Sequence, residues 1–374
     1  MIYEVLHKQP EDLYSSPIVQ QTAFWSTVKE RMGIHTLAID FKAALPDKSL
    51  EETHKVKRTS DLLVIIQPID GKHTIAYVPY GPELEPAEEL QGCFLEQLSE
   101  SIKPYLPANC ILIRYDLSWE SHWAKDKDYY DSKGLWLGPP ESITQEIRFN
   151  FSTEKWNLRK ASTNILPSNT LFINLRNSPK AILMQMKPKT RYNIGLSERK
   201  GITVRTAGID NLDVWYALYT ETAQRNGVYL HNVEYFRSVL LAKTTNALSP
   251  ADVKLLIAEK NGQPMAAMFL VISKNRAHYL YGASATEGRQ YMGSYALQWA
   301  AMQTAQKMGC TEYDMFGLAP RPNPSHPMYG LYRFKTGFGG KQFHRMGCWD
   351  YPLNNDLYSL YSTLEMNNQG FHLI

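Results

Sequence analysis

Short apolar runs rich in β-branched residues alternate with polar linkers in the first third of the chain. Four such runs, at residues 34–39, 61–67, 73–78 and 110–116, predict β-strands. Before the fourth run, apolar side chains recur at three- and four-residue spacing, at Leu90, Phe94, Leu95, Leu98 and Ile102. This spacing predicts a helix over roughly 89–105 whose apolar face packs on a sheet. The first third is therefore mixed α and β.

The second half of the chain repeats this order. Strand-like runs at 254–260, 265–273 and 278–284 precede a helical stretch near 292–308 and a further run at 311–317. The Asn-Gly-Gln-Pro segment at 261–264 predicts a hairpin turn. Similar intervals separate Tyr80 from Asp116 and Tyr281 from Asp314, which indicates a duplication. Three antiparallel strands, a helix and one more strand is the core order of GNAT-type acyltransferases, so we predict an α+β fold of two tandem GNAT-like domains.

The length of 374 residues favours two domains. Residues 117–165 interrupt the repeat with a polar, aromatic stretch that contains Gly138-Pro-Pro, and we interpret it as a surface loop rather than a ligand lid. A strand at 171–175 opens the second domain. We therefore expect domain 1 at 1–165 and domain 2 at 166–342, with residues 343–374 packing back on domain 1.

Composition excludes several classes of protein. The chain has 40 Lys and Arg against 37 Asp and Glu, so bulk charge does not indicate a general nucleic-acid coat. The four cysteines are too far apart for a CxxC metal or redox pair, and we expect neither a metal nor a cofactor. No segment approaches about 18 uninterrupted apolar residues, and acids occupy the first residues, so we expect a cytoplasmic protein.

Two stretches concentrate positive charge. Residues 186–205 hold six basic residues and one acidic residue, on a predicted short helix that begins at Pro188 and ends at Gly201. Residues 321–345 hold five basic residues and no acidic one, interleaved with aromatic residues and with Gly337, Gly339 and Gly340, which allow close backbone approach. Such faces suit phosphates and stacked bases, whereas the alternatives are a solvated basic helix and an aromatic core helix capped by glycine.

The segment that should bind acyl-CoA in a GNAT domain departs from the expected loop. Gln290 and Gly293 fit the pattern, but Tyr295 occupies a position that should be Gly or Ala, and its ring would obstruct a pyrophosphate. Walker, HExxH and GxSxG motifs are absent from the sequence. CoA is therefore disfavoured as the donor.

Six stretches together resemble the FemABX family over nearly the whole chain: 21–33, 75–82, 113–116, 187–202, 279–284 and His326-Pro-Met-Tyr-Gly-Leu-Tyr-Arg-Phe-Lys-Thr-Gly-Phe-Gly-Gly340. The resemblance implies a non-ribosomal peptidyltransferase that moves an amino acid from aminoacyl-tRNA to the stem-peptide side-chain amine of a peptidoglycan precursor, either lipid II or UDP-MurNAc-pentapeptide. Residues 191–254 lack sustained heptads, which indicates the type without a coiled-coil arm.

The resemblance also assigns candidate roles. Lys335 would stabilise the oxyanion of ester aminolysis as a fixed cation, Asp116 would lie in the peptide cleft and orient the acceptor amine or take its proton, and Tyr281 would hydrogen-bond the acceptor or the oxyanion. Tyr279, two residues from Tyr281, would point to the same face. The remaining precursor-binding candidates are Lys29, Tyr80, Arg191, His231 and Tyr235, and the tRNA-binding candidates are Phe334, Arg333 and Lys341.

Structural interpretations compete with several of these roles. Lys29 would otherwise be an exposed helix lysine, Asp116 a structural strand-end carboxylate, and the two tyrosines half-buried packing residues. His231 stands where relatives have Arg, and a mostly neutral imidazole is a weaker phosphate ligand.

Three functional readings remain open at this level. The first is the peptidyltransferase, expected as a monomer that touches the inner membrane leaflet. The second is a tandem-GNAT transferase acting on a protein or a polysaccharide. The third is a non-catalytic RNA-binding protein. The sequence does not specify the donated amino acid or the acceptor residue.

Overall fold

The computed structural model describes residues 1–46, 55–227, 230–325 and 328–367, and the chain divides into two compact units. Unit 1 comprises Met1–Ser168, Thr244–Ser249 and the segment that starts at His344; unit 2 comprises Asn169–Lys243 and Pro250–Phe343. The sequence placed the boundary near residue 165 and assigned 244–249 to the second domain. That short segment instead belongs to unit 1, because Leu248 N–H donates to Glu11 O at 2.9 Å and Ser249 Oγ accepts from Ala23 N–H at 2.9 Å.

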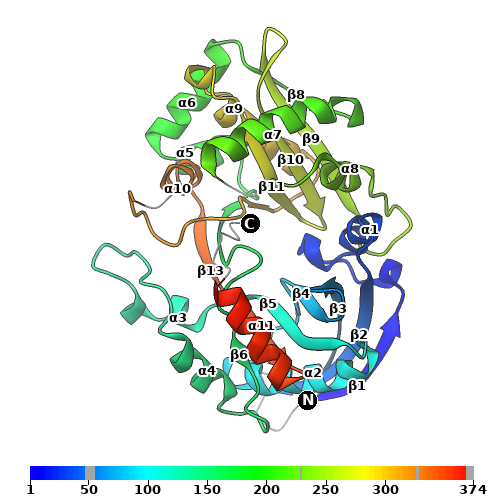
Figure 1. Cartoon of the computed structure of the whole chain (residues 1–374). Helices are drawn as coiled ribbons and strands as arrows, with labels where there is room; N and C mark the ends of the chain where they lie inside the picture. Colours follow the sequence, from blue (N-terminus) through cyan, green and yellow to red (C-terminus); the bar gives the residue numbers. More distant parts are fainter. Residues whose placement is uncertain (47–54, 228–229, 326–327, 368–374) are drawn as a thin grey trace. The chain divides into compact units, whose positions relative to one another are not determined.

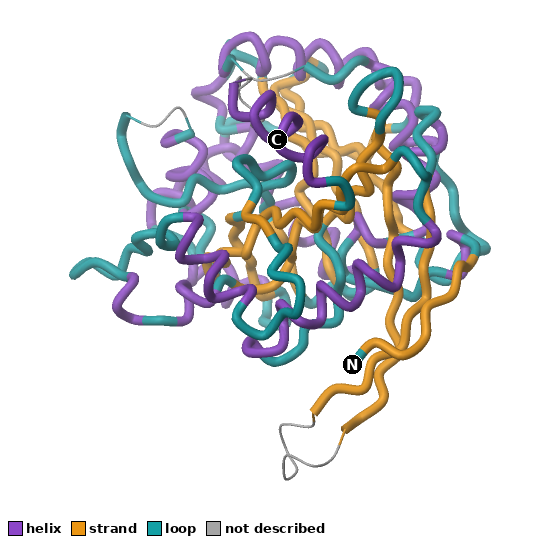
Figure 2. The backbone as a smooth tube through the Cα atoms, turned by 60° about the horizontal axis from the view of Figure 1, so that its bottom comes forward, coloured by secondary structure: helices purple, strands orange, loops and turns teal. Residues whose placement is uncertain are grey.

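The sheet of unit 1 has the strand order β1-β2-β3-β4-β5-β13, and β6 pairs with β13. Its strands are β1 (Ile2–Lys8), β2 (Thr36–Pro46), β3 (Lys55–Pro68), β4 (Thr74–Pro79), β5 (Cys110–Glu120), β6 (Arg159–Lys160) and β13 (Lys341–Pro352). Its helices are α1 (Ala23–Arg31), α2 (Gln91–Ile102), α3 (His122–Lys125), α4 (Ser142–Asn150) and α11 (Asn355–Asn367). β2 and β3 form a long antiparallel ribbon (Figure 2).

The predicted GNAT-like order is present in unit 1. β2, β3 and β4 are antiparallel neighbours, α2 follows, and β5 returns parallel to β4. The apolar face of α2 is buried against the sheet through Phe94, Leu95 and Leu98, as the spacing predicted. The tail adds β13 antiparallel to β5, and α11 is held there by the ion pair of Glu365 with Arg114 at 2.6 Å.

The interpretation of 117–165 as a surface loop was wrong in part. β5 extends to Glu120, and α3, α4 and β6 follow within this stretch. The reason is burial, because Trp123, Trp136, Phe149 and Leu158 are each at most 6% exposed and pack inside unit 1. The stretch is therefore an ordered part of the domain.

The sheet of unit 2 has the strand order β7-β12-β11-β10-β9-β8. Its strands are β7 (Asn169–Asn174), β8 (Thr203–Ala207), β9 (Ala251–Lys260), β10 (Gln263–Ser273), β11 (Arg276–Ser284) and β12 (Glu312–Asp314). Its helices are α5 (Pro179–Gln185), α6 (Pro188–Arg199), α7 (Leu212–Asn226), α8 (Val233–Leu241), α9 (Gly293–Lys307) and α10 (Tyr329–Thr336). α7 and α8 cover one face of the sheet, and α9 covers the other with α6 beside it (Figure 1).

Unit 2 repeats the order of unit 1. β9, β10 and β11 are antiparallel, α9 follows, and β12 is parallel to β11. The predicted hairpin is confirmed, because Asn261 and Gly262 have φ of 51° and 79° and Lys260 pairs with Gln263. Both units thus have a GNAT-like core. In the described part of residues 191–254 the longest helix is α7, with 15 residues, so this region carries no coiled-coil arm.

Candidate active site

The parallel strands β11 and β12 of unit 2 separate soon after they meet. They pair only through Arg276–His278 and Glu312–Asp314. Beyond Asp314 the chain turns toward β7, where Met315 N–H donates to Leu171 O at 3.0 Å and Leu318 N–H donates to Asn169 O at 2.9 Å. The second half of β11 therefore has no β12 residue beside it. A side chain of α10 lies at the point where the two strands diverge.

Lys335 of α10 lies at this divergence. Its Nζ donates hydrogen bonds to Phe316 O at 2.9 Å and Gly317 O at 2.6 Å, and it lies 5.3 Å from the ring centroid of Tyr279 on β11. An ammonium has three donors, so two are used by these carbonyls and the third can serve a substrate oxygen. The side chain is 4% exposed, and this burial lowers the pKa of Lys335 to about 7. The amine is thus held in position, as a fixed cation would be, and near neutral pH it lies close to the balance between its charged and neutral forms.

A buried carboxylate shapes the turn that holds Lys335. Asp314 Oδ1 accepts hydrogen bonds from Phe316 N–H at 2.8 Å and from the Thr170 hydroxyl, and its Oδ2 lies 3.6 Å from His278 Nδ1. Phe316 has a φ of 55°, in the left-handed region that residues with a side chain rarely adopt. The hydrogen bond to Asp314 holds this conformation. In this conformation the carbonyl oxygens of Phe316 and Gly317 both point toward Lys335 Nζ.

Tyr279 and Tyr281 lie on opposite faces of the sheet, so the prediction that they share a face was wrong. The register between β10 and β11 shifts, with Phe269 opposite Tyr281 and Leu270 opposite Tyr279, which leaves Leu280 as an extra, bulged residue. Tyr279 consequently packs with the core beneath α9, close to Lys335. Tyr281 packs against Phe236 of α8 at 5.3 Å. A one-residue bulge reverses the alternation on which the prediction depended.

Tyr281 belongs to an aromatic cluster with two other predicted residues. Its hydroxyl shares a hydrogen bond with the Tyr235 hydroxyl, and the His231 ring stacks on Tyr235 at 4.3 Å. Burial raises the pKa of Tyr235 to about 12 and raises that of Tyr281 well above its ordinary value, so both phenols remain protonated at neutral pH. The structure thus brings His231, Tyr235 and Tyr281 together, on the sheet face opposite Tyr279.

The predicted tRNA-binding residues differ in exposure. Phe334 is half-buried and meets Tyr295 at 5.0 Å and Phe338 at 5.2 Å, so part of its ring is committed to the protein interior. Arg333 is exposed and lies over the Tyr329 ring at 5.8 Å, and Lys341 is exposed at the start of β13. Arg191 is fixed within the fold, because its Nη1 donates to the carbonyl oxygens of Met184 and Met186. This nitrogen caps the end of α5, and the predicted contact of Arg191 with a precursor stays a prediction.

The predicted residues of unit 1 are more buried than the sequence suggested. Asp116 is 0% exposed, its Oδ2 accepts from Leu166 N–H at 2.8 Å and from the Tyr77 hydroxyl at 3.2 Å, and burial raises its pKa. Asp116 is therefore held inside unit 1, and its predicted place in the peptide cleft stays a prediction. Tyr80 is 3% exposed and donates to Pro167 O at 2.6 Å. Its side chain therefore supports the chain before Ser168, and its predicted contact with a precursor stays a prediction.

Lys29 is not the exposed helix lysine of the structural alternative. It lies half-buried on α1, with its Nζ 5.3 Å from the Trp25 ring centroid. Burial lowers the pKa of Lys29 to about 8. A lysine that is held against a ring and partly removed from water is a stronger local attractor for a phosphate than a solvated one.

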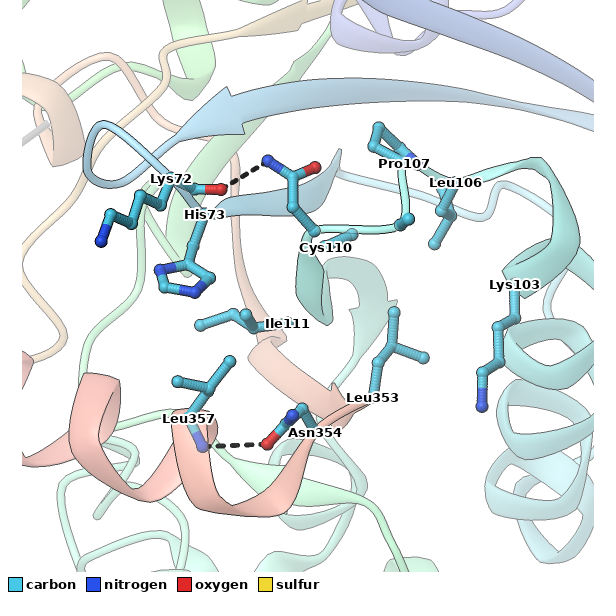
Figure 3. Close-up of a pocket in the computed structure, with 12 residues that line it drawn as sticks. Lys72, His73, Lys103, Leu106, Pro107, Cys110, Ile111, Leu353, Asn354 and Leu357 are labelled. Carbon is cyan, nitrogen blue, oxygen red and sulfur yellow. Dashed lines mark hydrogen bonds between the residues drawn. The ribbon is translucent and has the colours of Figure 1, made fainter.

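Unit 1 holds a cavity of about 400 Å³ (Figure 3). It is at the amino-terminal ends of β4 and β5, whereas Asp116 lies further along β5. Its walls include His73, Ile111, Leu353 and Leu357, with Lys72 and Lys103 at its edge, and none of the predicted site residues lines it. Among the described residues, His, Cys, Asp and Glu do not form a cluster of three that could hold a metal, and no helix is long and apolar enough to cross a bilayer.

The sequence missed the residues that orient Lys335. Asp314, Thr170 and His278 form the buried network behind it, together with the carbonyls of Phe316 and Gly317. The signal for Asp314 was available in the internal repeat, because Asp314 and Asp116 end corresponding segments of the two halves. In the structure they occupy equivalent strands, β12 and β5.

Known proteins are similar to this chain in sequence. Lipid II:glycine glycyltransferase of Staphylococcus saprophyticus is 23% identical over 258 residues, which cover 54% of this chain and 62% of that protein. The protein of the same name from Staphylococcus epidermidis is 22% identical over 310 residues, covering 65% of this chain and 73% of that protein. The chain thus spans less than two thirds of the first of these relatives.

A solved structure named FemX matches 96% of this chain and 100% of its own, with a TM-score of 0.71 and 16% sequence identity, which shows a shared fold. The FemAB family model matches residues 14–248 and 241–366. These ranges include the paired GNAT-like cores of both units and the α10 segment that supplies Lys335, and the chain therefore belongs to the FemAB family.

Proposed function

We propose that this protein transfers an amino acid from aminoacyl-tRNA to the stem-peptide side-chain amine of a peptidoglycan precursor and so builds the interpeptide bridge. Family membership and relatives named lipid II:glycine glycyltransferase support this reaction class. The observation that carries the proposal is the placement of Lys335 Nζ between two diverging strands, with two of its donors bound to backbone carbonyls.

The chemistry follows from that placement. The acceptor amine attacks the ester carbonyl, a C–N bond forms, and the carbonyl oxygen becomes an oxyanion. The free N–H of Lys335 would donate to this oxyanion, and one preorganised donor of this kind contributes about 3 kcal/mol to transition-state stabilisation. The C–O bond to the ribose then breaks and the ribose hydroxyl leaves.

The proton balance uses the lowered pKa of Lys335. The ammonium can give a proton to the departing ribose oxygen and recover one from the nitrogen of the new amide bond. A group with a pKa of about 7 performs both transfers near neutral pH. The ester is already activated, so no separate dedicated base is required, and positioning of the two substrates supplies much of the remaining acceleration.

The other predicted residues take supporting roles. Tyr279 packs beside Lys335, and the His231–Tyr235–Tyr281 cluster offers phenol donors to a polar acceptor. Lys29 would meet precursor phosphate in unit 1. Asp116 is not assigned a proton-transfer role, because it is fully buried and fixed by Leu166 and Tyr77.

The test uses purified protein with charged tRNAs and with both lipid II and UDP-MurNAc-pentapeptide, and mass spectrometry of the products. Lys335→Met is expected to lower the rate by roughly a hundredfold to a thousandfold. The matched control is Lys307→Met, which removes an exposed lysine at the end of α9. Equal rates for Lys335→Met and wild type would remove Lys335 from the mechanism. Absence of any precursor product with every charged tRNA would reject the function.

A further inference from the structure

The fold joins the two basic stretches that are far apart in the sequence. Lys187 N–H, at the start of α6, donates to Gly337 O, just after α10, at 2.8 Å. A Cβ at Gly337 would overlap Thr190 Oγ1 of α6, and one at Gly339 would lie 2.7 Å from Gln185 O of α5. These glycines therefore let α10 rest directly on the α5–α6 turn (Figure 1). The two basic stretches therefore form one surface of unit 2.

α6 has a buried face and a cationic face. Its buried positions are Thr190, Asn193, Ile194 and Ser197, at three- and four-residue spacing. Tyr192 and Arg199 follow the opposite face, with exposed Lys189 at its margin, and Tyr192 is 60% exposed. From Lys189 to Arg199 this face extends about 15 Å along the helix axis. The polar face is therefore long enough to meet several phosphates of one polyanion.

Cations gather on the exposed side of α6 and on the residues just before it. We define the α6 surface by Lys180, Lys187, Lys189, Tyr192, Arg199 and Lys200, all exposed. Within the described residues, its lysines and its arginine form no ion pair, and Glu198 is the one acid between 176 and 202. The Arg199 guanidinium lies over the Tyr192 ring at 5.7 Å. Cations gathered without counter-charges repel one another, and a polyanion relieves that repulsion.

We propose that the α6 surface binds the phosphate backbone of the base-paired acceptor stem of the RNA donor. This rests on the proposed function, since RNA is the polyanion in that reaction. RNA fits better than a membrane, because the surface adjoins α10, which carries Lys335. In the proposed reaction the ester lies at Lys335, so the acceptor stem that carries this ester must begin nearby. Phosphate contacts position a duplex without reading its sequence. The contacts of this surface therefore do not depend on the base sequence of the stem.

The experiment measures binding of an uncharged hairpin RNA with a single-stranded 3′ end, by fluorescence anisotropy over a range of salt concentrations. Lys189→Ala/Arg199→Ala is expected to weaken binding roughly tenfold at moderate salt and to make the log–log salt dependence shallower by about two. The matched control is Lys55→Ala/Arg58→Ala on β3, which removes one exposed lysine and one exposed arginine and is expected to bind as wild type does. Circular dichroism melting confirms that both variants are folded.

The outcomes separate this inference from the proposed function. Unchanged RNA binding by Lys189→Ala/Arg199→Ala would overturn the inference even if amino-acid transfer is observed. If this variant weakens RNA binding but the wild-type protein transfers no amino acid to any precursor, the inference about the α6 surface stands and the proposed function is rejected. Loss of binding to phosphatidylglycerol vesicles, with RNA binding unchanged, would assign the surface to a membrane and overturn the inference. A preference for one stem sequence that Lys189→Ala/Arg199→Ala abolishes would also overturn it.

Discussion

The carboxylate of Asp314 holds the backbone N–H of Phe316 at 2.8 Å, and Phe316 thereby keeps a φ of 55°. This single contact connects the end of β12 with the two carbonyls that orient Lys335. The geometry of the candidate active site therefore depends on a buried acid that does not itself face a substrate. Asp314 is 2% exposed, and it acts by positioning its neighbours.

Replacing Asp314 should disturb Lys335 without removing it. Asp314→Ala leaves Phe316 N–H and the Thr170 hydroxyl without their acceptor, which costs roughly 1–3 kcal/mol for each buried group left unsatisfied. We expect a lower melting temperature and a reduced kcat with a nearly unchanged KM for the RNA donor. Asp314→Asn keeps an acceptor for Phe316 and should recover part of both losses. Equal kcat values for Asp314→Ala and wild type would show that the turn does not position Lys335.

Gly282 provides the space for the Tyr279 side chain. A Cβ at Gly282 would overlap the hydroxyl and ring of Tyr279. Gly282→Ala should therefore destabilise the protein by roughly 1–3 kcal/mol through overpacking and displace Tyr279 from Lys335. Because the clash involves Tyr279 itself, the same substitution made in a Tyr279→Leu background should cost less. Urea denaturation of the four proteins in this cycle measures the coupling, and additive effects would contradict it.

Lys335 should make folding stability depend on pH. Its pKa is about 7 when folded and 10.5 at its ordinary value, so between these values the unfolded chain binds a proton that the folded chain lacks. Stability should therefore rise with pH across this window, and the gain is lost as pH falls toward about 7. Lys335→Met removes this pH-dependent contribution to the free energy of unfolding. From pH 7 to pH 9 the unfolding free energy of wild type should rise relative to that of Lys335→Met. If the unfolding free energies of the two proteins change in parallel with pH, Lys335 is not a buried amine with a lowered pKa.

Asp116 should behave as a structural residue. Asp116→Asn keeps an oxygen that can accept from Leu166 N–H and the Tyr77 hydroxyl, so we expect near wild-type stability and most of the transfer activity. Asp116→Ala leaves both donors unsatisfied and should lower the unfolding free energy by roughly 1–3 kcal/mol or more. Steady-state kinetics at fixed pH decide between the roles, because a proton-accepting carboxylate would lose its activity in a well-folded Asp116→Asn variant.

The local elements of this protein follow from its sequence. Periodic apolar positions identify α2, and the Asn261-Gly262 pair identifies the β9–β10 hairpin, because these signals depend on residues a few positions apart. The internal repeat and the motifs from 21 to 340 also identify two GNAT-like cores and the family. The network behind Lys335 was only partly accessible, through the repeat that aligns Asp314 with Asp116.

Tertiary structure alone decided which of these residues meet. The bulge at Leu280 places Tyr279 and Tyr281 on opposite faces, and strand register is a property of pairing that no local pattern contains. Burial sets the pKa of Lys335 and removes Asp116 from solvent, and burial depends on elements distant in the chain. The contact of Lys187 with Gly337 likewise joins two basic stretches that the sequence shows only as separate. Sequence determined the elements and the chemistry available, whereas long-range packing determined the geometry in which that chemistry can act.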